Sequence, residues 1–279
     1  MPDFQTSDGV QMHYETWGDP ASPPVVLLHG FTASLRMWNA QVEPLSADYF
    51  VVAPDLRGHG ASDAPEDLDT YTLERFALDI RELLDEMSIE ICALAGCSFG
   101  GMIALQFGVL FPERLACLVI SDASPAYEHP AYDERFHTRE AGMLEHEKLA
   151  EKLGMAGLGK KLAAGMSDPF LADGIRSRYA RLSLAGFLGS SRTRRERPDL
   201  TPLLRDRLAM PVMLCDGDED PVYCALAVMA NELPEARVVT FAGAGHGLPV
   251  QRPEPFTDEL FAFLEDVEAG RPVAGQRKV

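Results

Sequence analysis

The chain has 279 residues, 46% of them hydrophobic, which is enough apolar material for one large domain or for one domain with an insertion. A net charge of −18 disfavours binding to nucleic acid or to an anionic membrane surface, because like charges repel. No apolar run approaches the roughly 18 residues that a membrane-spanning helix needs, so we expect neither a nucleic-acid nor a membrane partner.

Short, continuously apolar runs recur along the chain and predict buried strands. They cover residues 25–28, 50–53, 91–95, 115–120, 212–215 and 238–241. Continuous apolar runs fit strands that are covered on both faces, as in a parallel sheet, whereas residues 12–17 alternate and suit an antiparallel edge. Helical spacing predicts helices over 73–87 and 256–264, so strands and helices alternate as in α/β folds. The tail, residues 270–279, is expected to be loose.

One interval breaks this alternation. Between Ser124 and Arg197 no segment reads as a strand, and helical patterns rich in Ala, Leu, Met, Glu and Lys fill it. A structureless loop of about 70 residues is implausible in a compact domain, so we expect a mostly helical insertion over the sheet. The predicted organisation is a core of residues 1–125 and 198–279 with a helical cap of residues 126–197.

The strongest local signal is a glycine-rich turn. Residues 96–101, which directly follow the predicted strand 91–95, read GCSFGG. A nucleophile on a tight strand-to-helix turn has a strained backbone, and small residues two positions to either side, here Gly96 and Gly100, relieve the clash. A Gly-x-Ser-x-Gly match alone is weak, but between a strand and a helix it is specific. We therefore predict Ser98 as a nucleophile rather than an idle serine.

Four further motifs occur in a consistent order along the chain. They are Leu28–Phe31 (LHGF), Asp55–Ser62 (DLRGHGAS), Gly217–Pro221 (GDEDP) and Gly243–His246 (GAGH). Together with the serine turn, they resemble the α/β-hydrolase fold family, specifically its single-domain members with a helical cap. The resemblance covers residues 6–268. It implies a mostly parallel sheet of the eight-stranded type flanked by helices, with the insertion as a cap over the active site.

A serine hydroxyl needs a base to take its proton. Of the seven histidines, His246 is the best candidate, because it follows the last predicted strand in a glycine-rich loop. Loops at the carboxyl ends of strands are where an open α/β sheet presents its site. The resemblance implies that His29 and His59 shape loops. The others, expected on an edge strand or in the cap, are His13, His129, His137 and His146.

An acid must orient that imidazole. Asp220 follows strand 212–215, and the order Ser, Asp, His is the one that the family resemblance implies. Its neighbours Asp216, Asp218 and Glu219 also read as a solvated acidic turn, and the family spacing favours Asp220. Asp122, after strand 115–120, is a separate alternative, because some relatives place the acid there.

The developing oxyanion needs N–H donors. The backbone N–H of Phe99, after the nucleophile, is one, and the resemblance places the second at Phe31. Cys97 reads as a small packed hydrophobe rather than a reactive thiol. The arginine run over residues 192–197 reads as a solvated loop that offsets the surrounding acidity, with anion binding as the alternative.

These features predict a serine hydrolase that acts on a small-molecule ester or lactone through an acyl-serine. The alternatives are a carbon–carbon bond hydrolase for diketones, an enol-lactonase or a lyase of the same fold, and a non-catalytic small-molecule binding protein. Dehalogenases and epoxide hydrolases of this fold use an Asp nucleophile, whereas position 98 is Ser. The cap's apolar side chains are expected mostly to pack together, leaving a minority facing Ser98 in an apolar pocket with few polar anchors.

No cofactor or metal is expected, because the chain has neither a G-x-G-x-x-G phosphate turn nor clustered Cys and His ligands. The five cysteines are odd in number, and most lie in apolar segments, which indicates reduced thiols and a cytoplasmic protein. The first residues carry no basic or apolar stretch of the secretory type. The sequence leaves a homodimer open.

Overall fold

The computed structural model describes residues 3–279, and their strands form one nine-stranded sheet in the order β1-β2-β4-β3-β5-β6-β7-β8-β9. The strands are β1 (Asp3–Gln5), β2 (Gln11–Trp17), β3 (Pro24–Leu28), β4 (Phe50–Pro54), β5 (Cys92–Cys97), β6 (Leu115–Ser121), β7 (Val212–Gly217), β8 (Arg237–Phe241) and β9 (Gly275–Lys278). β1 pairs antiparallel with β2, and β2 with β4, whereas the other pairs are parallel.

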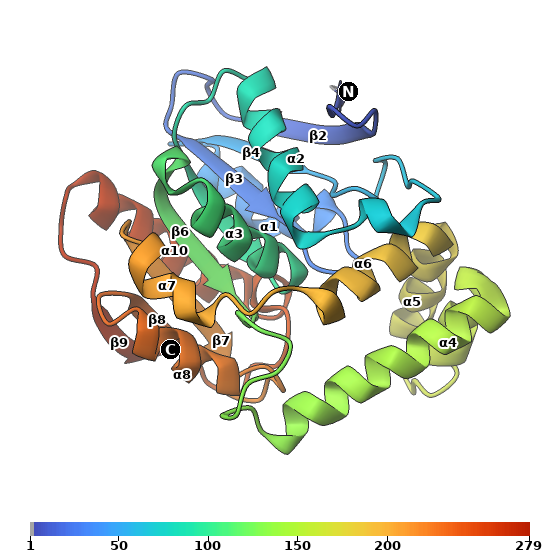
Figure 1. Ribbon diagram of the computed structural model, residues 1–279. Coiled ribbons are helices and arrows are strands. Elements are labelled where there is room, and N and C mark those ends of the chain that lie inside the picture. Colours follow the sequence, from blue (N-terminus) through green and yellow to red (C-terminus); the bar gives the residue numbers. More distant parts are fainter. Residues whose placement is uncertain (1–2) are drawn as a thin grey trace.

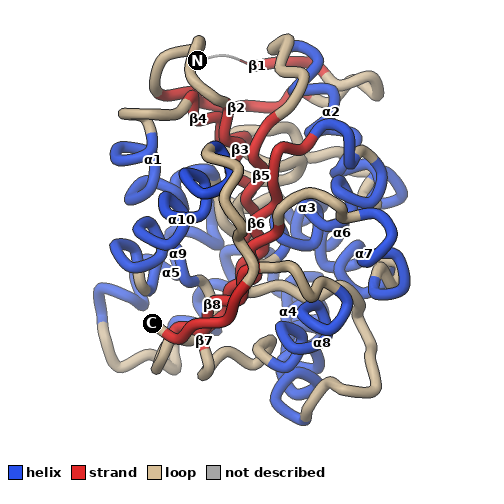
Figure 2. Tube along the Cα trace, turned by 90° about the vertical axis from the view of Figure 1, so that its left-hand side faces the viewer, coloured by secondary structure: helices blue, strands red, loops and turns tan. Residues whose placement is uncertain are grey.

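Helices cover both faces of this sheet (Figures 1 and 2). They are α1 (Asn39–Leu45), α2 (Leu73–Glu86), α3 (Phe99–Leu110), α4 (Glu134–Ala163), α5 (Pro169–Arg181), α6 (Leu184–Glu196), α7 (Thr201–Arg207), α8 (Cys224–Glu232), α9 (Leu248–Gln251) and α10 (Pro253–Glu268). Figure 2 views the sheet nearly edge-on, with α1, α9 and α10 on one side and α2, α3 and α7 on the other. The fold is therefore the layered α/β architecture that the alternation predicted.

The central strands are apolar throughout because each face of the sheet has its own core. In β3, Val25 and Leu27 pack into the cluster with α1 and α10, whereas Val26 and Leu28 pack into the cluster with α2 and α3. All four side chains are buried, and each such burial stabilises by about 1.5–3 kcal/mol. Alternate residues thus serve opposite cores, and no polar position is left along the strand.

Two sequence predictions differ from the structure at strand ends. Strand β5 begins at Cys92, because Ile91 lies at the sheet's rim with 52% of its surface exposed. The prediction of a loose tail is wrong for Gly275–Lys278, which pairs in parallel with β8 as β9. Main-chain hydrogen bonds between Val279 and Thr240 and between Ala242 and Val279, both 2.8 Å, extend this pairing.

The insertion between β6 and α7 contains helices α4, α5 and α6 (Figure 1), and its positions 126–133, 164–168, 182–183 and 197 lie outside them. Only some of its apolar side chains are buried, contrary to the expectation that most would pack together. Phe136, Met155, Leu158 and Phe187 are buried, whereas Leu144, Met166, Phe170 and Leu184 are exposed. Helices on the surface of a domain have one side exposed to solvent, and in this insertion the exposed side includes large apolar residues.

No helix within residues 3–279 is both long and apolar enough to cross a membrane. The five cysteines are free, and four of them are buried; Cys224 is partly exposed. Burial raises the pKa of the Cys97 thiol well above its usual range, with the neighbouring Asp122 carboxylate adding to the shift. Cys97 is therefore a packed, protonated side chain, in agreement with its sequence interpretation.

Candidate active site

Ser98 lies on a strained turn between β5 and α3. Its φ of 56° and ψ of −116° lie in a region that residues with a side chain rarely adopt. A Cβ atom at Gly96 would lie 2.2 Å from the Gly100 carbonyl oxygen, and one at Gly100 would lie 2.2 Å from the Leu28 oxygen. The Ser98 N–H donates to the Ser121 carbonyl on β6 at 2.8 Å, which fixes the turn to the sheet. Gly96 and Gly100 are thus required by space, because a side chain at either position would collide with the main chain.

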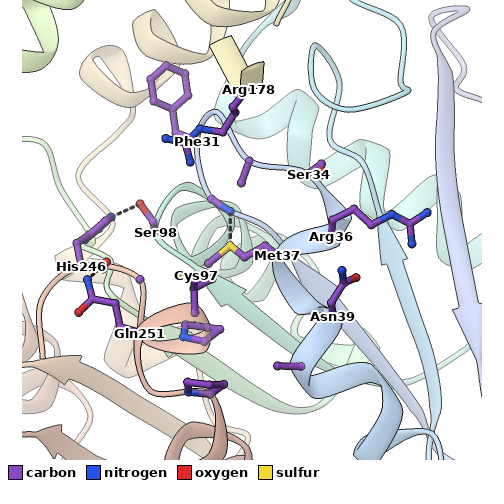
Figure 3. Close-up of a pocket in the computed structure, with 17 residues that line it drawn as sticks. Phe31, Ser34, Arg36, Met37, Asn39, Cys97, Ser98, Arg178, His246 and Gln251 are labelled. Carbon is purple, nitrogen blue, oxygen red and sulfur yellow. Dashed lines mark hydrogen bonds between the residues drawn. The ribbon is translucent and has the colours of Figure 1, made fainter. Parts of the chain in front are cut away.

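Ser98, His246 and Asp220 form a chain of hydrogen bonds. The Ser98 hydroxyl lies 2.8 Å from His246 Nε2, and Asp220 Oδ2 lies 2.7 Å from His246 Nδ1 (Figure 3 shows the first contact). Because a carboxylate only accepts, Nδ1 carries the proton, and Nε2 is left to accept from Ser98. The three residues follow β5, β8 and β7, so the structure brings together at one edge the side chains that the sequence singled out.

Asp220 is fully buried, and its charge is stabilised locally. Its second oxygen accepts the Val222 N–H at 2.9 Å. Burial by itself raises the pKa of Asp220, but the hydrogen bond and charge of His246 and the Val222 N–H outweigh it, so the pKa lies below its usual value. Asp220 is therefore an anion that holds the imidazole of His246 in one orientation.

Asp122, the alternative acid, lies behind the histidine loop. Its carboxylate accepts the N–H of Gly247 at 2.9 Å and of Leu248 at 3.1 Å, and it also accepts the Ser121 hydroxyl. Within the described part of the chain, no hydrogen bond joins Asp122 to the imidazole of His246. In the structure, Asp220 therefore bonds to the imidazole of His246, whereas Asp122 bonds to the main chain of the two residues that follow His246.

The other acidic neighbours of Asp220 do not contact His246. Asp216 is buried, and burial together with the Asp122 and Asp220 carboxylates raises its pKa well above the usual range. Asp218 accepts the Gly243 N–H at 2.8 Å and pairs with Lys278 at the surface. The interpretation of these residues as a solvated acidic turn is therefore correct for Asp218 and wrong for Asp216.

Phe99 directly follows Ser98 at the start of α3, and Phe31 lines the same cavity as Ser98. Among residues 3–279, neither of their main-chain N–H groups donates a hydrogen bond to a protein acceptor. The loop that carries Phe31 is braced by His29, whose Nδ1 donates to the Gly30 carbonyl at 2.8 Å while its Nε2 accepts the Leu56 N–H at 3.0 Å. Burial lowers the pKa of His29 to about 4, so it stays neutral as this bonding requires. These two donors are available to an oxyanion.

A cavity of about 690 Å³ opens beside Ser98. It is lined mainly by the loop after β3, by the short helix η1 (Leu35–Trp38) and the start of α1, and by the His246 loop with α9. The insertion contributes Arg178. The expectation that apolar insertion side chains form the pocket is wrong, because Met37, Ala40, Pro249, Val250 and Pro253 of the core line it instead. Figure 3 shows Arg178 reaching toward Phe31.

The arginine run proves to be the end of helix α6, with two faces. Arg192 and Arg195 lie outward in ion pairs with Asp69, Glu196 and Glu147. Arg194 and Arg197 are buried, and Arg194 Nη2 donates to both oxygens of Glu140 at 2.7 Å. The expectation of a solvated loop is therefore wrong for Arg194, within α6, and for Arg197, which directly follows the helix.

Sequence reasoning missed Arg139 of α4, which reaches the proposed base. Its Nη2 lies 3.2 Å from His246 Nε2, and its Nη1 donates to Glu140 at 2.6 Å. No motif surrounds Arg139, and an arginine in a charged helix normally reads as solvated, so the sequence carries no signal for this contact. Arg178 was missed for the same reason.

One cluster has the ligand types of a metal site. Single atoms of Asp122, Asp220 and His246 lie within 4.8 Å of one another. Their ligand atoms, however, already accept main-chain N–H groups or bond to one another and to Ser98. Surrounding N–H donors suit an anionic group rather than a cation, so this donor set does not fit a metal ion.

Comparison with known proteins agrees with this architecture. Residues 23–253 match the family described as alpha/beta hydrolase fold. The chain is 30% identical to a Bacillus subtilis protein that is provisionally named 2-succinyl-6-hydroxy-2,4-cyclohexadiene-1-carboxylate synthase. The alignment covers 94% of this chain and 97% of that protein. The chain is also 26% identical to mouse Epoxide hydrolase 4, over 92% of this chain and 77% of that one.

Among solved structures, a thermophilic esterase from Thermogutta terrifontis superposes with a TM-score of 0.80 at 25% identity, covering 96% of this chain and 99% of the esterase. These relatives have different activities on one fold, so what they share is architecture. The match to the family extends over most of the chain and includes the strands and loops that carry Ser98, Asp220 and His246. The chain belongs to the α/β-hydrolase fold family.

Proposed function

We propose that this protein is a serine hydrolase that cleaves a carboxylic ester or lactone bond of a small molecule through an acyl-serine intermediate. Ser98 is the nucleophile, His246 the general base and Asp220 the acid that orients it. The observation that carries this proposal is the unbroken hydrogen-bond chain from Asp220 to the Ser98 hydroxyl. The insertion acts as a cap over this site, and residues 126–197 form it.

In the first half-reaction the Ser98 hydroxyl attacks the substrate carbonyl while His246 Nε2 takes its proton. The carbonyl oxygen becomes an oxyanion, which accepts the N–H groups of Phe31 and Phe99. The tetrahedral intermediate collapses, and protonated His246 gives its proton to the departing alcohol oxygen. The acyl group then remains as an ester on Ser98.

In the second half-reaction a water molecule attacks the acyl-serine, with His246 again taking the proton. The same two N–H groups hold the second oxyanion. Collapse releases the carboxylic acid and returns the proton to Ser98. Asp220 stays ionised throughout and stabilises the imidazolium that forms twice.

The family contains several chemistries, and the residue at position 98 separates them. The chain is similar to a named epoxide hydrolase, but the epoxide hydrolases of this fold use an Asp nucleophile, and position 98 is Ser. The similarity to an esterase supports ester hydrolysis. Neither half-reaction of the proposed ester hydrolysis requires a cofactor or a metal.

A second candidate is a lyase or a carbon–carbon bond hydrolase that uses the same serine, acid and base. Arg139 favours it, because a cation beside the base suits a substrate that gains or keeps negative charge near the reacting carbon. The similarity to the Bacillus subtilis protein supports the same alternative. A meta-cleavage-type diketone compared with nitrophenyl esters separates the two, because the preferred bond gives the larger kcat/KM.

The decisive experiment replaces the nucleophile. Ser98→Ala should lower kcat for a nitrophenyl ester by about 10⁴-fold or more, because the hydroxyl is the attacking group. A fluorophosphonate should label the wild-type protein and spare the variant, while circular dichroism shows an unchanged fold. Retention of more than a few per cent of activity by Ser98→Ala would refute the proposed function.

A further inference from the structure

Two donors compete for one acceptor at the proposed base. The Ser98 hydroxyl at 2.8 Å and Arg139 Nη2 at 3.2 Å both approach Nε2 of His246. Neutral imidazole has a single lone pair on that nitrogen, so it cannot serve both donors fully. A guanidinium held here weakens the hydrogen bond that activates Ser98 unless another acceptor takes the arginine N–H.

Arg139 is held in this place by its neighbours. Glu140 accepts its Nη1, and Glu140 is itself bound by the buried Arg194. The guanidinium of Arg194 also lies 5.6 Å above the ring of Phe31, the residue that carries one proposed oxyanion donor. Arg139 Nη2 is thus directed at the reaction centre by a chain of ion pairs that is largely buried.

Positive charge exceeds negative charge on this side of the site. Arg139, Arg194 and Arg197 gather around one carboxylate, that of Glu140, and Arg197 has no carboxylate within 4 Å among the residues described. Arg194 Nη1 is buried without a hydrogen-bond partner there. Buried charge without a counterion is costly, and the chain as a whole carries a net charge of −18. A local excess of cations therefore calls for an anion.

Arg139 reaches His246 from outside the cavity lining, whereas helix α5 places another cation in the lining itself. Arg178 lines the cavity together with Ser98 and Phe31, and within residues 3–279 no carboxylate lies in ion-pair range of it. The other arginine of the lining, Arg36, is already paired with Glu15. Figure 3 shows Arg178 extending toward Phe31, whereas Arg36 points away from Ser98.

We infer that the substrate of this enzyme carries a carboxylate besides the bond that is cleaved, and that Arg139 and Arg178 bind it. The inference rests on the proposed function and names its substrate class: acidic esters or lactones. The substrate carboxylate accepts the Arg139 N–H, and Nε2 of His246 is then free for Ser98. A neutral ester leaves Arg139 on the base and is a poorer substrate.

A matched pair of esters tests this directly. The mono-nitrophenyl ester of adipic acid and nitrophenyl hexanoate have acyl chains of equal length and differ in the terminal carboxylate. We expect the wild-type protein to prefer the adipate ester by at least about tenfold in kcat/KM, which corresponds to the loss of one charge-assisted contact. Initial rates near pH 8, corrected for spontaneous hydrolysis, give the ratio.

Variants then assign the preference to residues. Arg139→Met should lower kcat/KM for the adipate ester at least tenfold and raise it for the hexanoate ester, because the competing donor is removed from His246. Arg178→Met should lower the adipate value mainly through KM. Arg192→Met, on the outward face of α6 and paired with Asp69 and Glu196, is the control and should keep the wild-type ratio.

The outcomes separate this inference from the proposed function. If both esters are hydrolysed through Ser98 with equal kcat/KM, or if the two arginine variants keep the wild-type ratio within twofold, the carboxylate site is wrong and the serine hydrolase stands. If neither ester is hydrolysed and fluorophosphonate leaves Ser98 unlabelled, the proposed function itself fails. A preference that disappears in both variants and survives in Arg192→Met supports the carboxylate site.

Discussion

The sheet core and the insertion place functional groups by different means. In the core, Ser98, Asp220 and His246 are fixed by turns directly after strands, where main-chain hydrogen bonds and glycines leave little freedom. In the insertion, Arg139 and Arg178 extend from helices, and ion pairs or open space surround them. The proposed chemistry therefore depends on backbone geometry, whereas the proposed substrate choice depends on long side chains that can change without altering the fold.

The largest expected effect concerns the two buried carboxylates of the core. Asp220→Asn should lower kcat by about 10⁴-fold, because the amide cannot hold the same imidazole tautomer. Asp122→Asn should lower it only about tenfold, since it removes the charge behind the two hydrogen bonds from the loop and leaves the imidazole contact in place. Steady-state kinetics on a nitrophenyl ester gives both values. The reverse ranking would move the proposed acid to the end of β6.

A glycine-to-alanine pair tests the contrast in packing. Gly100→Ala should destabilise the protein by about 3 kcal/mol, because its Cβ would lie 2.2 Å from the Leu28 oxygen. Gly174→Ala in helix α5 should stabilise it by about 0.5–1 kcal/mol, since nothing lies within 4 Å of that Cβ and alanine favours helix. Urea unfolding measures both. Equal effects at the two sites would remove the distinction between rigid core and open insertion.

The same contrast explains what the sequence could predict. Ser98 could be located because its motif lies between a strand and a helix, and His246 because it follows the last predicted strand. The family resemblance favours Asp220 over its acidic neighbours. The buried pair Arg194 and Arg197 could not be predicted, because charge normally indicates exposure and only the three-residue spacing hints at a shared face. Arg139 needed the tertiary structure, since its partner His246 lies 107 residues away.

Acid stability should depend on histidines of the core. Burial lowers the pKa of His29 to about 4 and of His59 to about 3, while the unfolded values stay near 6.5. Between these values the unfolded chain binds more protons at these two positions than the folded one, so their contribution to stability falls as pH decreases below about 6.5. From pH 7.5 to 5 each histidine should cost on the order of 2 kcal/mol in the free energy of unfolding.

Urea unfolding at several pH values measures this slope. His137→Gln, at an exposed position of helix α4, should leave it unchanged and serves as the matched control from the insertion. If His29→Gln and His59→Gln each left the pH dependence of the unfolding free energy unchanged, the neutral, buried state of the two histidines would be contradicted.

The smallest expected effect is at the solvent side of the insertion. Phe170→Ser, at a side chain with 84% of its surface exposed, should change the free energy of unfolding by less than about 0.5 kcal/mol. Ester kinetics should not change either. A loss of more than about 1 kcal/mol in urea unfolding, or altered kinetics, would show that this apolar face is covered in solution.

Because β9 is an outermost strand of the sheet, a label on it can be used to follow unfolding of the whole sheet. β1 and β9 are the two outermost strands, so eight interstrand spacings of about 4.8 Å separate them by roughly 40 Å. Fluorescent dyes attached at Gln5 and Gln276, both exposed, would sit at opposite ends of that row. Their energy transfer would report the separation of the two outer strands, and so at what point during unfolding the row of strands loses its span.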